Sequence, residues 1–113
     1  MDDLLQQIGS RILSRRKQLR MTQEELAEKA GITPQTVSSA ELGKKALRPE
    51  NIIRICSALD ISTDYLLLGN VNAADHSLLL SKLAALPIQY RHLEDIINSF
   101  ILALEEHGAQ GGK

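Results

Sequence analysis

The stretch TQEELAEKAGITPQTVSSAEL, residues 22–42, predicts two short helices joined by a tight turn. Thr22 precedes Glu25 by three residues, which is the capping box that starts a helix. Gly31 can adopt the left-handed conformation that ends a helix. Thr33 and the proline after it favour a second start, because proline fits the first helical position. We expect the second helix to end near residue 43.

Two short helices separated by such a turn form a helix-turn-helix, whose second helix enters the major groove of DNA. Small and apolar residues should form the buried seam between the helices. The outward face carries an amide and several hydroxyl groups and no acid, which suits base edges and phosphates. The seam is expected to contain Leu26, Ala30, Ile32, Val37 and Ala40, and the outward face Thr33, Pro34, Gln35, Ser38, Ser39 and Leu42.

The rest of the chain also has helical periodicity and no strand pattern, so we expect an all-α fold. A long helix should cover residues 3–20, a fourth helix should open at Pro49, and a fifth should be capped by Ser62 or Thr63 and end at Gly69. These helices would make residues 1–69 a five-helix DNA-binding domain. The small, polar residues 70–77 are expected to be a linker, residues 78–107 a pair of helices that breaks at Pro87, and residues 108–113 a disordered tail.

The distribution of charge supports a nucleic-acid partner although the net charge is −1. Residues 10–48 carry nine basic and four acidic residues, and binding to phosphate depends on this local field. The composition otherwise fits a protein of the cytoplasm, because no apolar run is long enough to span a bilayer and a single cysteine, Cys56, cannot form an internal disulfide.

Six segments of the chain match one known pattern in register. They are TQEELA (22–27), AGIT (30–33), VSS (37–39), ELGK (41–44), PEN (49–51) and ALDISTDYLL (58–67). The chain thereby resembles the helix-turn-helix of the Cro/CI (XRE-type) repressor family over about residues 9–69. The loop that follows Gly43 is longer than the common pattern and resembles the lambda-repressor form of the domain. The resemblance implies a five-helix DNA-binding domain that acts as a transcriptional repressor.

Roles for individual residues follow from this resemblance. Gln35 should make the main base contact, since glutamine can bond adenine N6 and N7 together. Pro34 departs from the family pattern, where many relatives use this position to read a base, so more specificity falls to Gln35 and Ser39. Arg16 and Glu41 match positions that often form an ion pair between the first helix and the recognition helix. The predicted base contacts are Gln35, Ser38, Ser39 and Lys45, and the predicted backbone contacts are Thr22, Gln23, Thr33, Thr36, Lys44 and Arg48.

The C-terminal helices suggest self-association. Apolar residues from Tyr90 onward recur at spacings of three and four, as in the seam of a helix pair. We therefore expect a homodimer that binds a palindromic operator. Two alternatives remain open: the helices fold back on their own domain, or they bind another protein, as in the antitoxin of a toxin–antitoxin pair. The predicted dimerisation residues are Tyr90, Leu93, Ile97, Phe100, Ile101 and Leu104.

The sequence gives no indication of catalysis or of a metal or cofactor. His76, His92 and His107 are far apart and have no cysteine or carboxylate at ligand spacing. Cys56 shares a helical face with apolar residues, so we expect a buried core thiol, with a redox switch as the lesser alternative. We expect a protein that is not an enzyme.

Overall fold

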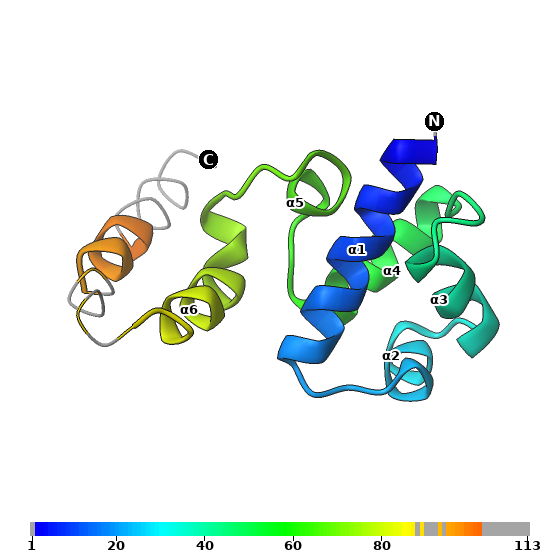
Figure 1. The fold of residues 1–113 in the computed structure, drawn as a ribbon, viewed down its shortest axis with the longest axis horizontal. Helices are drawn as coiled ribbons and strands as arrows, with labels where there is room; N and C mark the ends of the chain where they lie inside the picture. The colour runs from blue at the N-terminus through cyan, green and yellow to red at the C-terminus, as the bar shows by residue number, and fades with distance from the viewer. Residues whose placement is uncertain (1, 88, 90–92, 94, 103–113) are drawn as a thin grey trace, which may run out of the picture.

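The computed structural model describes residues 2–87, 89, 93 and 95–102, and within these ranges the chain is helical and contains no strand. The predicted all-α class is confirmed, with five helices forming the N-terminal domain (Figure 1). Residues 95–102 are also helical. The elements are α1 (Asp2–Gln18), α2 (Gln23–Ala30), α3 (Pro34–Glu41), α4 (Pro49–Leu59), α5 (Thr63–Leu68), η1 (Ala73–Asp75) and α6 (His76–Ala84).

The ends of α2 and α3 lie where the capping signals place them. The Thr22 hydroxyl accepts a hydrogen bond from the Glu25 backbone N–H at 3.0 Å, and the Glu25 carboxylate accepts one from the Thr22 N–H at 2.9 Å. Gly31 follows α2 with φ of 72°, the left-handed conformation. Thr33 caps α3, and its hydroxyl accepts from the Thr36 N–H at 3.1 Å. The helix-turn-helix is therefore fixed by local hydrogen bonds at both helix starts.

Two other boundaries refine the prediction. Helix α1 ends at Gln18 and not at Arg20, because Arg20 takes a left-handed backbone conformation with φ of 58° that no helix can include. The cap of α5 is Ser62, whose hydroxyl accepts from the Tyr65 N–H at 3.0 Å. Gly69 ends α5 with φ of 80°.

The core of the domain is one cluster of mostly aliphatic side chains to which all five helices contribute. Val37 of α3 belongs to this cluster and has no exposed surface. Ile32, at the turn, is half-buried and packs against the same cluster. Burial of each such side chain contributes about 1.5–3 kcal/mol before conformational entropy is subtracted. The fully buried members are Ile12, Leu26, Val37, Ile55, Leu59 and Leu66.

Gly9 marks the closest approach between α1 and α3. A Cβ atom added at this position would lie within 3.0 Å of the backbone carbonyls of Ala40 and Glu41, at 2.6 Å from the Glu41 oxygen. Such distances are not found in folded proteins, and backbone atoms cannot move aside as a flexible side chain can. The absence of a side chain at Gly9 therefore sets how closely the recognition helix packs on α1.

The segment that we predicted as a linker, residues 70–77, contains η1 and the first two residues of α6. Asp75 is fully buried, and its carboxylate accepts hydrogen bonds from the Ser62 backbone N–H at 2.6 Å and from the Ser62 hydroxyl at 2.7 Å. Leu78 of α6 is buried in the same cluster as the five-helix core. The second half of the segment is thus packed against the domain. The sequence alone did not reveal that the Asp75 carboxylate would have hydrogen-bond partners there.

We predict that Gly9→Ala lowers the free energy of unfolding by about 1–3 kcal/mol, the usual range for overpacking a core. Alanine is the better helix former by about 1 kcal/mol, so a purely local effect would have the opposite sign. Urea unfolding measures the change. The matched control is Ser10→Ala, at an exposed position of the same helix. A Gly9→Ala protein as stable as Ser10→Ala would contradict the close packing.

Candidate nucleic-acid interface

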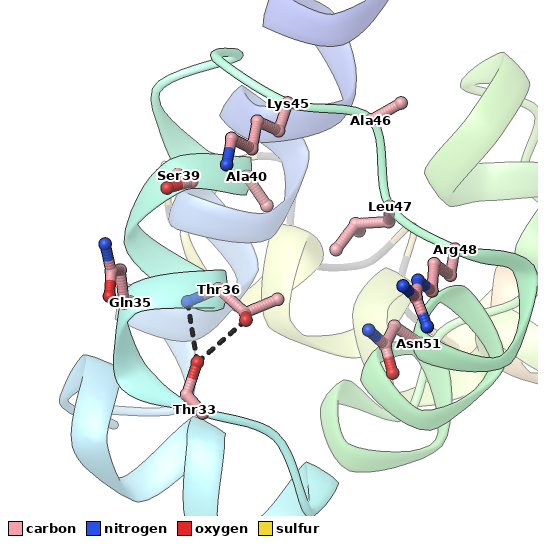
Figure 2. A pocket seen from close by; sticks show the side chains of 10 residues that line it. All are labelled: Thr33, Gln35, Thr36, Ser39, Ala40, Lys45, Ala46, Leu47, Arg48 and Asn51. Carbon is pink, nitrogen blue, oxygen red and sulfur yellow. Dashed lines mark hydrogen bonds between the residues drawn. The ribbon is translucent and has the colours of Figure 1, made fainter.

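A groove runs between the recognition helix α3 and the loop that precedes α4. Its volume is about 360 Å³, and one wall comes from α3 and the other from residues 45–48 and Asn51 (Figure 2). None of the residues that line it is acidic, whereas Lys45 and Arg48 are both cationic. An open, polar and positively charged groove is suited to an anionic backbone and to base edges. The lining residues are Thr33, Gln35, Thr36, Ser39, Ala40, Lys45, Ala46, Leu47, Arg48 and Asn51.

Figure 2 shows how the predicted contact residues divide around this groove. Gln35 and Ser39 project from the outer side of α3, whereas Thr36 points across the groove toward the loop. Lys45 extends from the loop back toward α3, and Arg48 approaches from the start of α4. Six of the predicted contact residues therefore line one surface: Thr33, Gln35, Thr36, Ser39, Lys45 and Arg48.

Four predicted contact residues lie outside the groove. Thr22 and Lys44 are exposed, and Ser38 is half-buried. Gln23 is also half-buried, and its side-chain N–H donates to Glu41 at 2.9 Å. The Thr22 and Thr33 hydroxyls already accept backbone hydrogen bonds at the starts of α2 and α3, so both residues also have a structural role.

Sequence reasoning assigned no role to Asn51, which lines the groove opposite α3. Asn51 lies in the first turn of α4, three residues after Arg48, so one helix start presents an amide and a guanidinium to the same space. The signal was available, because the segment PEN (49–51) is part of the pattern that the chain resembles.

A charged cluster behind the groove ties α3 to α1 and α2. Arg16 forms two hydrogen bonds with the Glu41 carboxylate, from Nε at 2.7 Å and from Nη2 at 3.0 Å. Its third bond goes from Nη1 to the Met21 carbonyl at 2.8 Å, and Gln23 adds another donor to Glu41. The Glu41 side chain is only 4% exposed. The hydrogen bond to Glu41 raises the pKa of Arg16, whereas partial burial acts in the opposite direction.

This cluster fixes the position of α3 relative to α1 and α2, whereas the Thr33 cap fixes only where the helix begins. A bidentate arginine–carboxylate pair fixes orientation as well as distance. Because Glu41 is the last residue of α3, the pair anchors the end of the recognition helix that lies far from its Thr33 cap. The resemblance had implied an ion pair at Arg16 and Glu41 and a glutamine at Gln23 that braces the recognition helix, whereas the bond from Arg16 to the Met21 carbonyl was not foreseen.

Other chemistry finds no support in the described part of the chain. It contains no group of three His, Cys, Asp or Glu side chains arranged to hold a metal ion. Burial raises the pKa of the Cys56 thiol to about 11, so the reactive thiolate is scarce at neutral pH. None of the described helices has the length and apolar character that crossing a membrane requires.

The residues predicted for dimerisation separate into different environments. Leu93 and Phe100 are exposed, at 37% and 63%, and Ile97 is half-buried. Ile101 is only 2% exposed, so it packs within its own chain and is not free to contact a partner, which corrects our assignment. Ile96, which we had not assigned, is 63% exposed. Tyr90 and Leu104 lie outside the described residues.

A capped recognition helix, a turn that starts at the left-handed Gly31 and a groove without acidic residues define a DNA-binding helix-turn-helix domain. Comparison with known proteins agrees: a family model described as helix-turn-helix matches residues 12–66. The chain is 42% identical over 57 residues to the uncharacterized HTH-type transcriptional regulator YqaE of Bacillus subtilis (strain 168), over 50% of this chain and 49% of the relative. It is 36% identical over 75 residues to repressor protein C2 of Salmonella phage P22, over 64% of this chain and 35% of the relative.

The chain carries a helix-turn-helix domain of the Cro/CI (XRE-type) family. It spans about half the length of one of these relatives and about a third of the other. The helix-turn-helix family model lies within the five-helix domain.

We predict that Arg16→Met lowers the free energy of unfolding by about 3–5 kcal/mol, because it leaves the Glu41 carboxylate buried without its cation. The double variant Arg16→Met, Glu41→Leu should lose less than this single variant, since no unpaired charge remains. Urea unfolding of the wild type, both single variants and the double variant gives the coupling energy. Additive losses would show that the pair does not hold α3.

Proposed function

We propose that the chain is a transcriptional repressor that binds a palindromic operator as a homodimer. The observation that carries the proposal is the groove that Gln35 and Ser39 of α3 line together with Lys45 and Arg48 of the loop. The printed names of the two relatives, a transcriptional regulator and a phage repressor, support regulation of transcription.

In this proposal both walls of the groove contribute to reading bases and to binding phosphate. Gln35 is exposed on the second position of α3 and can form paired hydrogen bonds with adenine. Ser39, one turn later on the same face, adds a shorter contact. Lys45 reaches toward the base edges, and Arg48 with Thr36 binds phosphate and sets the register of α3 on the duplex.

Dimerisation rests on the apolar stripe, which we define as Leu93, Ile96 and Phe100. Spacings of three and four place these three side chains on one face of a helix. All are exposed, whereas Ile101, farther round the same helix, is buried within the chain. The apolar surface of this helix is thus wider than the part buried within its own chain. The apolar stripe of a second copy can pack against the exposed part. Two recognition helices would then meet half-sites one helical turn apart.

We predict that Gln35→Ala weakens binding to the selected operator by about 1–3 kcal/mol and relaxes the base preference at one position of each half-site. Lys45→Ala tests the other wall: it should also weaken binding to unrelated duplexes and reduce the dependence of affinity on salt. Selection from a random duplex pool, followed by titrations at several salt concentrations, measures both effects. Lys29→Ala, an exposed cation of α2 outside the groove, is the matched control. Failure to enrich any sequence would contradict base reading by α3.

We predict that Phe100→Glu converts the dimer to a monomer, because a charge in a buried apolar interface has no partner. Sedimentation at tens of micromolar protein distinguishes the two states. Ser99→Glu adds the same charge at the adjacent exposed position and should leave the dimer intact. A wild-type monomer, or a Phe100→Glu dimer, would rule out the apolar stripe as the interface.

A further inference from the structure

Arg15 is a buried cation on the side of α1 away from the DNA-binding groove. Its side chain is only 1% exposed, and its guanidinium forms four hydrogen bonds. Nε donates to the Leu59 carbonyl at 2.9 Å, and Nη1 donates to Gln18 at 3.1 Å. The other two bonds reach α6: Nη2 donates to the Ser77 hydroxyl at 2.8 Å, and Nη1 to the Ser81 hydroxyl at 3.2 Å. None of these four acceptors carries a charge.

The two serines hold the guanidinium from successive turns of α6. Ser77 and Ser81 are four residues apart and so lie on one face of the helix. The Ser81 hydroxyl in turn donates to the Ser77 carbonyl at 3.0 Å, which orients its lone pairs toward Arg15. The two hydroxyl groups that accept from Arg15 follow one another along the axis of α6, and the guanidinium that donates to them is planar. Together these bonds define the direction of α6 as well as its position.

Further contacts hold α6 against α1 and α5. Leu78 is buried in the core of the DNA-binding domain, and the Lys82 ammonium lies 5.4 Å from the centre of the Tyr65 ring. At the start of α6, Asp75 is bonded to Ser62. Figure 1 shows α6 and α3 on opposite sides of α1. Helix α6 is therefore connected to the recognition helix through α1.

The hydrogen-bond acceptors of Arg15 are all neutral, and the Asp60 and Asp75 carboxylates interact with its charge without a hydrogen bond to it. Such a buried arginine contributes little to stability. Taking its charge from water is costly, and an apolar side chain of similar size often serves as well or better. What Arg15 provides and an apolar residue cannot is directional bonding between α1 and α6. This contrast points to a role in geometry.

We propose that Arg15 is a positioning residue that fixes the direction in which α6 leaves the DNA-binding domain, and thereby the separation of half-sites that the dimer accepts. The proposal rests on the dimer proposed above. One base pair added between half-sites rotates them by about 35° about the DNA axis, since a turn contains about 10–10.5 base pairs. A dimer with fixed α6 accepts one spacing, and a dimer with loosened α6 accepts several.

The first test measures the direction of α6 without DNA. Spin labels at Lys29→Cys on α2 and Ala85→Cys after α6, in a Cys56→Ala background diluted with unlabelled chains, report the distance distribution within one protomer. We expect a narrow distribution that broadens in Ser77→Ala, Ser81→Ala and narrows again in Ser77→Thr, Ser81→Thr, which restores both hydroxyl groups. An unchanged width in the alanine variant would overturn the proposal.

Two further variants separate positioning from general loosening. The double variant Ser57→Ala, Ser99→Ala, which removes two exposed hydroxyl groups, should leave the distribution narrow. Arg15→Met keeps the volume of the side chain and removes its directional bonds. It should remain folded and show the broad distribution. A narrow distribution in Arg15→Met would assign the direction of α6 to packing alone.

The second test compares duplexes whose half-sites are separated by spacers that differ by single base pairs. Wild type should prefer one spacer by about a hundredfold, because a mismatched geometry prevents both copies from binding together. The Ser77→Ala, Ser81→Ala variant should lose most of this preference and keep its affinity for an isolated half-site. A preserved preference despite a broad distance distribution would overturn the role of Arg15 in spacing. Absence of DNA binding or of a dimer would instead refute the proposed function, while the distance measurement would still decide what Arg15 holds.

Discussion

The position of the recognition helix depends on the contact between α1 and α3. Gly9 lets the two backbones approach, because no side chain occupies the space beside the Ala40 and Glu41 carbonyls. Arg16 then binds the Glu41 carboxylate at the end of α3, and Gln23 adds a bond from α2. The recognition helix has only eight residues, too few to be stable alone in water. Its DNA-binding face therefore exists because α1 holds it in place.

The helix boundaries could be predicted because they are local. The capping box at Thr22, the left-handed Gly31 and the Thr33 cap each depend on residues within one turn, so the sequence alone specifies them. The contact surface of α3 followed from the same boundaries together with the family pattern. Contacts between residues far apart in the chain were harder to predict, because nothing in the sequence pairs Gly9 with Glu41.

The region after α5 shows where sequence reasoning reached its limit. Small and polar residues predicted a linker at 70–77, but Asp75 is buried against Ser62 and α6 packs on the domain. The spacing of the apolar residues predicted a helix here, and residues 95–102 are helical. The spacing alone could not show which face of this helix is buried within its own chain. Ile101 is buried within the chain and Ile96 is exposed, because packing, and not spacing, decides which apolar residues are left for a partner.

The proposed DNA-binding surface consists of α3 and the loop after it, and NMR spectroscopy can locate the surface that contacts DNA. Backbone amide chemical shifts can be followed while a mixed-sequence duplex is added at low salt, where phosphate contacts alone give binding. We expect the largest changes within residues 33–39 and 44–51, with α6 unaffected. Changes concentrated in α6 with a silent α3 would contradict the proposed surface.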